Sequence, residues 1–389
     1  MNPGTQARSI PIDRDARRRW SRALRRIALV VMLVVFPAGL YAGFLPSGEA
    51  GFDMHLAYAP AARDVLDAAN PYPAALDSAD VLNEHAYAYP PLLAFLVAPL
   101  TVFSDVTAGY LGAYGALVLA GLVLLVLGVR DWRCYGAMLL WAPIYNAVQN
   151  ANVSIAVALL VALAWRWREH IWRPGAALGL AIAVKLVMAP LLLWPLAMAR
   201  TRAALAGAVV AAGAVLLPWT AIGFAGLTEY PGLLDRLQEL ESRQSYSVYS
   251  ALVGIDVPEG VATAVTLAVG LGLAIGCVRW GRNGDDRRAL TAAIALVLVV
   301  SPLVWQHYYT LLLVPVALAW RTVSIAWLLP IVLWTTGVAG DGNALQTFVA
   351  VGTMAVVVLL CLRPPVREVA GPQDPAWLPR QLRPVELTS

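Results

Sequence analysis

Long apolar stretches with almost no charged side chains run through most of this sequence. Hydrophobic residues make up 60% of its 389 residues and charged residues 13%, whereas an average soluble domain carries about 25% charged residues. The mean hydropathy is +0.67. Because about 20 apolar residues in a helix cross the hydrocarbon core of a bilayer, the pattern predicts an all-α polytopic membrane protein with about 12 transmembrane helices.

Five stretches have the length and composition of clear spans: residues 27–44, 108–128, 205–222, 261–278 and 344–362. Eight arginines precede the first stretch, seven of them between residues 14 and 26, and cytoplasmic segments of membrane proteins carry an excess of Lys and Arg. We therefore interpret the first stretch as an uncleaved anchor that starts in the cytoplasm. The predicted organisation is a basic cytoplasmic N-terminus (1–26), a membrane domain (27–362) and a disordered cytoplasmic tail (363–389).

Further arginine-bearing breaks mark the cytoplasmic side, at residues 130–133, 166–173, 200–202, 279–288, 321 and 363–367. With the first span leaving the cytoplasm, the polar loop 46–90 is predicted to be extracytoplasmic. Residues 91–103 are too few to cross a bilayer in the usual way, which favours a re-entrant or interfacial segment. The alternative, a short true span, would place residues 130–133 outside and break the charge pattern.

The loop 46–90 holds an unusual set of ionisable residues: Asp53, His55, Arg63, Asp64, Asp67, Glu84 and His85. Ionisable residues beside or within the bilayer are by default candidates for a functional site. Partial desolvation of Asp53 near the interface would raise its pKa toward that of a usable general base. A helix cap or a solvated loop residue is the equally simple reading of Asp53, and Asp64 and Asp67 fit the wet face of a short helix.

The same loop is rich in tyrosine and proline, with Tyr58, Tyr72, Tyr87 and Tyr89. Tyrosines at this depth form interfacial belts in many membrane proteins. Aromatic rings beside carboxylates also form platforms for sugar rings, and the spacing leaves both readings open. A second outer loop, residues 223–250, contains a short amphipathic helix, with Leu233, Leu234, Leu237 and Leu240 opposite Asp235, Arg236, Glu239 and Glu241.

Two polar residues within apolar stretches complete the candidate chemistry. His307 could donate to a phosphate and offset its charge, or it could simply hydrogen-bond the backbone. Lys185 lies deep in an apolar segment, where a lysine costs roughly 2.5–3.5 kcal/mol on insertion scales. It must reach the interface, pair with a carboxylate or face a polar cavity that holds an anion, and its distance from the cytoplasmic arginines favours the cavity.

The sequence lacks the motifs that are characteristic of several classes of enzyme and transporter. No P-loop, GxGxxG, HExxH or GxSxG motif occurs in a supporting context. Cys134, Cys277 and Cys361 are isolated and read as apolar fillers, so no metal site and no cofactor is predicted. The net charge of +4 comes with arginines at span ends, and nucleic-acid binding is therefore not expected.

Short polar motifs in a fixed order carry a family resemblance. They are Asp53, Tyr58, Asn70-Pro71-Tyr72, Tyr89-Pro90-Pro91, Gln149–Asn152, Lys185, Gln244-Ser245 and Trp305-Gln306-His307-Tyr308. Between residues 27 and 362 the chain resembles the bacterial polyprenyl-phosphate-dependent glycosyltransferases of family 87, typified by actinobacterial mannosyltransferases. It departs from their usual pattern at Ala68-Ala69, Ala147-Val148 and Arg243.

The resemblance implies a GT-C fold with an outward-facing active site in the plasma membrane. It implies transfer of a sugar, most simply mannose, from a polyprenyl-phosphate donor to a glycolipid or cell-envelope glycan, with inversion. Asp53 would be the general base and His307 the second catalytic residue. The implied substrate-binding residues are His55, Tyr58, Tyr72, Tyr89, Asn150, Asn152, Lys185, Arg243, Gln244, Trp305 and Tyr308.

Three other readings compete with this one. Within the same class, the chain would be an arabinofuranosyltransferase that uses a polyprenyl-phosphate pentose. A secondary transporter would show internal repeats and matching interrupted helices, which the sequence lacks. A non-catalytic membrane scaffold would tolerate the loss of Asp53 and His307 together.

Overall fold

The computed structural model describes residues 26–44, 50–83, 85–337 and 343–363, and these residues form helices and no strand. The predicted N-terminal segment up to residue 25 and the predicted tail from residue 364 lie outside the described residues. Five helices are long and apolar enough to cross a membrane: Arg26–Gly43, α6 (Asp105–Val126), α12 (Thr201–Ala221), α15 (Glu259–Arg282) and α19 (Ala344–Cys361). The second half of the first of these overlaps α2 (Phe36–Phe44). These five helices coincide with the five spans predicted most clearly from the sequence.

The remaining membrane-domain residues form shorter helices. In chain order these are η3 (Met54–Tyr58), α3 (Ala59–Leu66), α4 (Ala79–Leu82), α5 (Pro91–Val97), η4 (Ala98–Val102), α7 (Trp132–Leu139), α8 (Ala142–Gln149), α9 (Ser154–Arg166), α10 (Arg173–Val184), η5 (Leu186–Leu192), α11 (Leu193–Ala197), α13 (Tyr230–Glu241), α14 (Val248–Val253), α16 (Asp286–Val300), η6 (Gln306–Leu312), α17 (Leu313–Ala319), α18 (Ile325–Leu328) and η7 (Leu329–Thr336). A bent pair, α8 and α9, could count as a sixth span. The predicted total of about 12 spans is therefore not confirmed for the described residues, because proline, glycine and polar residues divide the apolar stretches into shorter helices.

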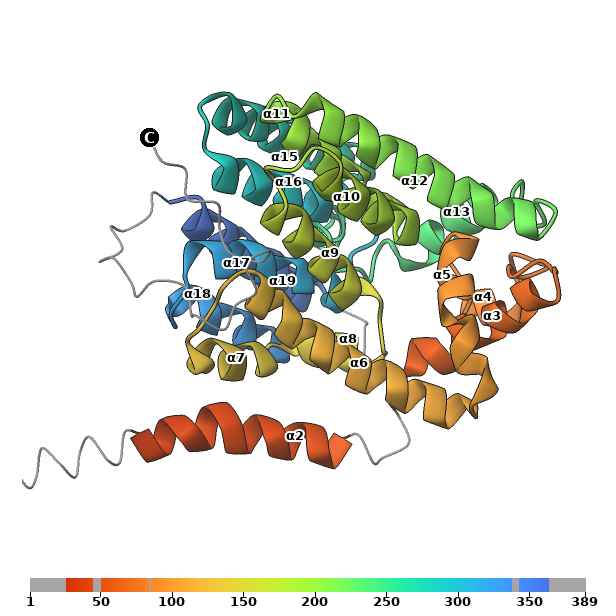
Figure 1. Cartoon of the computed structure of the whole chain (residues 1–389), viewed down its shortest axis with the longest axis horizontal. Helices are drawn as coiled ribbons and strands as arrows, with labels where there is room; N and C mark the ends of the chain where they lie inside the picture. Colours follow the sequence, from red (N-terminus) through yellow and green to blue (C-terminus); the bar gives the residue numbers. More distant parts are fainter. Residues whose placement is uncertain (1–25, 45–49, 84, 338–342, 364–389) are drawn as a thin grey trace, which may run out of the picture.

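The helices form one bundle with two distinct ends (Figure 1). At one end Arg200 bonds Asp286 and Glu169, and Arg168 also contacts Asp286. Arg287 donates to the carbonyl oxygens of Cys361 and Arg363. The interactions thus join four of the arginine-bearing breaks that the sequence assigned to the cytoplasmic side.

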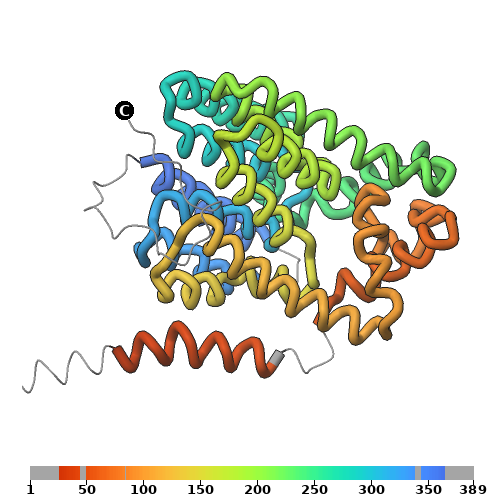
Figure 2. The backbone as a smooth tube through the Cα atoms, viewed as in Figure 1, coloured from red at the N-terminus to blue at the C-terminus, as the bar shows by residue number. Residues whose placement is uncertain are grey.

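The polar loop after α2 lies at the opposite end of the bundle. Figure 2 shows the orange segment that follows α2 gathered beside the green end of α12. Tyr230 of α13 donates to the carbonyl oxygen of Ala88, and Tyr246 N–H donates to that of Val304. The two predicted outer loops therefore meet at one end.

The segment predicted to be re-entrant forms α5 and η4. It starts at Pro90, and its far end precedes Asp105, which pairs with Arg63 of α3. Both ends of the segment thus lie at the polar-loop end, in agreement with a re-entrant or interfacial path. The predicted amphipathic helix is α13, but Glu241, which was assigned to its wet face, is buried because the helix end packs into the bundle.

Helices α10 and α12 approach each other closely through glycines. A Cβ added to Gly179 would lie 2.6 Å from the carbonyl oxygen of Gly207 and 2.8 Å from Cβ of Val210. Such small-residue contacts let membrane helices pack backbone to backbone. We expect Gly179→Leu to destabilise the fold by about 1–3 kcal/mol through overpacking, measured as a lower Tm in detergent.

The matched control for this prediction is Gly213→Leu, on α12 itself. A Cβ at Gly213 meets only Cδ1 of Leu217 at 4.0 Å. An equal drop in Tm in both variants would show that the loss of stability does not depend on the close contact between α10 and α12.

Candidate active site

The polar loop is tied to the turn between α8 and α9 by backbone hydrogen bonds. Gly51 N–H donates to the carbonyl oxygen of Gln149 at 2.6 Å, and Asp53 N–H donates to that of Asn150 at 3.1 Å. Gly51 has φ +84° and its Cα faces Gly109 of α6, where a side chain would clash. The close approach fixes Asp53 at the tip of the bent α8–α9 pair.

The Asp53 carboxylate accepts two hydrogen bonds from neutral side chains. Asn152 Nδ2 lies 2.5 Å and Tyr58 Oη 3.2 Å from Oδ2 of Asp53. Burial raises the pKa of the Asp53 carboxyl, while these two hydrogen bonds and the charge of Lys185 oppose the rise. A half-buried carboxylate with a raised pKa can accept a proton from a hydroxyl near neutral pH.

Asn152 is held in the orientation that this contact needs. Its Oδ1 accepts the backbone N–H of Ser154 at 2.9 Å, so its amide NH₂ faces Asp53. The turn depends on Ala151, whose φ of +51° is unusual for a residue other than glycine. Ser154 in turn accepts a hydrogen bond from Lys185 Nζ at 2.9 Å, so one short turn positions both the carboxylate and the ammonium group.

Lys185 occupies the break between α10 and η5. Its side chain is buried, with 4% exposed, and its Nζ lies 3.3 Å from the centre of the Tyr308 ring. Among the described residues no carboxylate forms an ion pair with it; Asp53 acts on it only through the electrostatic field. Of the three settings predicted from the sequence, burial argues against reaching the interface, and the cavity with an anion remains the proposal.

His307 lies beside Lys185 and has one ring nitrogen to spare. Nδ1 of His307 is 3.1 Å from Oδ1 of Asn146, which accepts the ring N–H. Asn150 approaches the same oxygen at 3.4 Å. The residue is 6% exposed, and Nε2 has no hydrogen-bond partner among the described residues. Nε2 is therefore a buried ring nitrogen whose hydrogen-bonding capacity the described residues leave unused.

The tyrosines of the loop form a packed cluster rather than an open platform. Tyr72 contacts the rings of Tyr87, Tyr230 and Trp219, and all four side chains are buried. Tyr89 is half-buried and packs edge-to-face on Tyr58, with ring centres 5.5 Å apart. Of the four loop tyrosines, only Tyr89 is not fully buried.

Many of the residues predicted for the site come together in the structure. Contacts or electrostatic interactions connect Asp53, Tyr58, Tyr89, Asn150, Asn152, Lys185, His307 and Tyr308. We call these eight residues the Asp53–Lys185 cluster.

Four predicted residues lie apart from the cluster, and a fifth, Tyr72, touches it only by donating its hydroxyl to the carbonyl oxygen of Tyr89. His55 packs its ring against Gly109, and Tyr72 belongs to the buried aromatic group. Arg243 is exposed and pairs with Glu259 at 3.0 Å, and Gln244 beside it is also exposed. Trp305 is half-buried at the start of η6. The resemblance marked these positions as motif neighbours, which does not ensure that their side chains share a direction.

Two residues of the site were not singled out from the sequence. Ser154 lies two positions after Asn152, and Asn146 lies one helical turn before Asn150. The i,i+4 spacing of the two asparagines on one helix face was a usable signal. A second usable signal, for the position of the site as a whole, was that Lys185 is the only lysine in the chain.

Comparisons with known proteins show which family the chain belongs to. The model of glycosyltransferase family 87 matches residues 87–305, more than half of the chain. The chain belongs to glycosyltransferase family 87. It is thus a membrane glycosyltransferase; the matched range contains Asn152 and Lys185 but neither Asp53 nor His307.

Two characterised relatives are similar over much of their length. One, from Mycolicibacterium smegmatis, is named a polyprenol-phosphate-mannose-dependent alpha-(1-2)-phosphatidylinositol pentamannoside mannosyltransferase and is 24% identical, covering 92% of this chain and 88% of the relative. The other, from Mycobacterium tuberculosis, is named a polyprenol-phosphate-mannose-dependent alpha-(1-2)-phosphatidylinositol mannoside mannosyltransferase and is 27% identical, covering 62% of this chain and 64% of the relative. No solved structure matches this chain.

Proposed function

We propose that this family 87 enzyme transfers mannose from a polyprenyl-phosphate donor to a glycolipid or cell-envelope glycan at the outer side of the plasma membrane. The single observation that carries the proposal is the Asp53–Lys185 cluster, in which a carboxylate and a buried ammonium group share one turn. The names of both relatives support mannose and a lipid-linked donor. A GT-C fold is part of the same proposal.

The depth of the cluster supports a donor that is anchored in the bilayer. Helix α9 has 13 residues and α10 has 12, so each spans roughly 20 Å at 1.5 Å per residue. Their arginine ends are at one end of the bundle, and Ser154 and Lys185 are at their other ends. A hydrocarbon core is about 30 Å thick, so a phosphate at Lys185 would sit below the far boundary, where a lipid carrier can present it.

The mechanism assigns a single displacement to these groups. The acceptor hydroxyl gives its proton to Asp53 as its oxygen bonds the anomeric carbon. The bond from that carbon to the phosphate oxygen breaks, and the phosphate leaves with the electron pair. Attack opposite the leaving group inverts the anomeric centre, as in inverting glycosidases, but a phosphate leaving group needs no general acid.

Lys185 and His307 have complementary roles in this mechanism. The ammonium group offsets the charge that develops on the phosphate in a water-poor site. His307 donates through Nδ1 to Asn146, so the neutral ring accepts a hydrogen bond from a sugar or acceptor hydroxyl at Nε2. A ring protonated at both nitrogens would donate to the phosphate instead.

The test is a transfer assay with the purified full chain in detergent. Polyprenyl-phosphate mannose and glycolipids extracted from the membrane are expected to give a mannosylated lipid whose new linkage has the anomeric configuration opposite to that of the donor. Transfer of pentose from polyprenyl-phosphate pentose in place of mannose would support the arabinofuranosyltransferase reading. Equal use of GDP-mannose would contradict a lipid-phosphate donor.

A further inference from the structure

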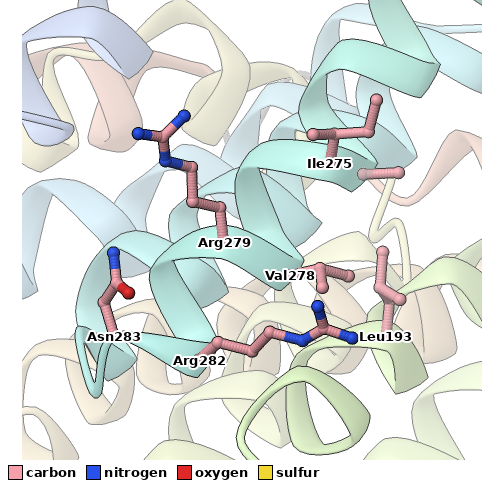
Figure 3. Close-up of a pocket in the computed structure, with 7 residues that line it drawn as sticks. Leu193, Ile275, Val278, Arg279, Arg282 and Asn283 are labelled. Carbon is pink, nitrogen blue, oxygen red and sulfur yellow. The ribbon is translucent and has the colours of Figure 1, made fainter.

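A groove at the arginine-bearing end of the bundle lies far from the Asp53–Lys185 cluster in the fold. It has a volume of about 420 Å³ and lies between the last turns of α15 and Leu193, the first residue of α11 (Figure 3). Trp194, the next residue, donates to Asp286, which also binds Arg200. The groove therefore belongs to the end that carries the arginine breaks.

Apolar residues form the floor of the groove and basic ones its rim. The floor consists of Leu193, Ala274, Ile275 and Val278. Gly281 packs directly on the backbone of Ala197, which brings α15 against α11. Ile275 is 59% exposed, so an apolar ligand would still cover surface there.

The rim carries positive charge that no carboxylate of the described residues neutralises. Arg279 and Arg282 project from successive turns of α15, beside Asn283 (Figure 3). Within residues 26–44, 50–83, 85–337 and 343–363, no ion pair joins either arginine to a carboxylate, whereas the nearby Arg200 and Arg288 both have one. Within the described part of the chain, both guanidinium groups are therefore without an anionic partner.

We propose that this groove binds one anionic phospholipid of the leaflet at the arginine-bearing end. Arg282, whose guanidinium group points toward Leu193 (Figure 3), holds its phosphate by charge-assisted hydrogen bonds, Arg279 adds positive charge to the rim, and an acyl chain covers the apolar floor. A lipid fits both halves of the groove, because a free phosphate would leave the floor bare and an uncharged lipid would leave the arginines unpaired. The site is separate from catalysis, since it lies at the end opposite Asp53.

The experiment is native mass spectrometry of the purified full chain with phosphatidylglycerol or phosphatidylcholine added in detergent. We expect the wild type to retain phosphatidylglycerol preferentially and Arg279→Gln/Arg282→Gln to weaken that binding by about tenfold. The matched control is Arg202→Gln/Arg321→Gln, which removes the same charge from two exposed arginines outside the groove and is expected to bind like the wild type.

A second variant tests the apolar floor of the groove independently of its two arginines. Ile275→Trp keeps both arginines but fills the floor, and it is expected to reduce phosphatidylglycerol binding even where the double arginine variant cannot be purified. Equal weakening in the control variant, or equal retention of the two lipids by the wild type, would overturn the proposal. Displacement of phosphatidylglycerol by an equal concentration of inorganic phosphate would overturn it too, in favour of a free anion.

Discussion

Replacing Asp53 with Asn is expected to lower kcat by about 10³-fold, within the range lost when a general base is removed. The amide cannot take up the acceptor proton, yet it can keep the contact with Tyr58 and the size of the side chain. The measurement is the rate of mannosyl transfer at saturating donor, with Tm recorded in the same detergent.

The control for this variant is Asp67→Asn, in the same polar loop. Asp67 is exposed and ends helix α3, so its substitution is expected to leave kcat and Tm at wild-type values. Full turnover by a well-folded Asp53→Asn enzyme would remove Asp53 as the base and would leave the family assignment intact.

The pH dependence gives an independent check on Asp53. The base must be ionised, so the rate falls as the pH drops through its pKa. Because burial raises the pKa of Asp53, the acid limb of kcat/KM is expected above the range of an ordinary carboxyl. Asn152→Ala removes a hydrogen bond that lowers this pKa, so it should move the limb to still higher pH, whereas a merely structural Asn152 would lower the rate without moving it.

Hydropathy predicted the long helices of this fold well, because a strong apolar run such as α6 needs no partner to be recognised. For the shorter helices it gives a number of crossings that the described residues do not confirm. The chain breaks at Lys185, and the extended backbone there (φ −146°, ψ 94°) cannot be read from an apolar sequence with a single polar residue. The estimate of about 12 counts such pieces as separate spans, whereas five helices of the described residues are long and apolar enough to span alone.

The candidate site was predicted in part, for a similar physical reason. Asp53, Lys185 and His307 stand out because each is polar in an apolar setting, which is costly. The charge of Arg243 gave no comparable indication of a site, because a charged residue in an outer loop is solvated and has no such free-energy cost. Arg243 instead pairs with Glu259 at the surface. The link through Ser154 required the structure, because a serine at a helix start is common for other reasons.

Lys185→Met is expected to lower kcat by about 10²–10³-fold, the loss found when one group that stabilises developing negative charge is removed. The methionine keeps the length and the apolar stem of the side chain but not its charge. Donor binding should weaken as well, because the phosphate loses its counterion before and during the reaction.

Stability separates a catalytic Lys185 from a structural one. A buried ammonium group without an ion pair is costly, so the apolar methionine should leave Tm unchanged or raise it while activity falls. A structural lysine would instead lower Tm together with activity. As the only lysine of the chain, Lys185 can also be followed directly with an amine-selective reagent: polyprenyl phosphate should protect it from labelling, and labelling that is unaffected by the lipid would contradict a phosphate site at this residue.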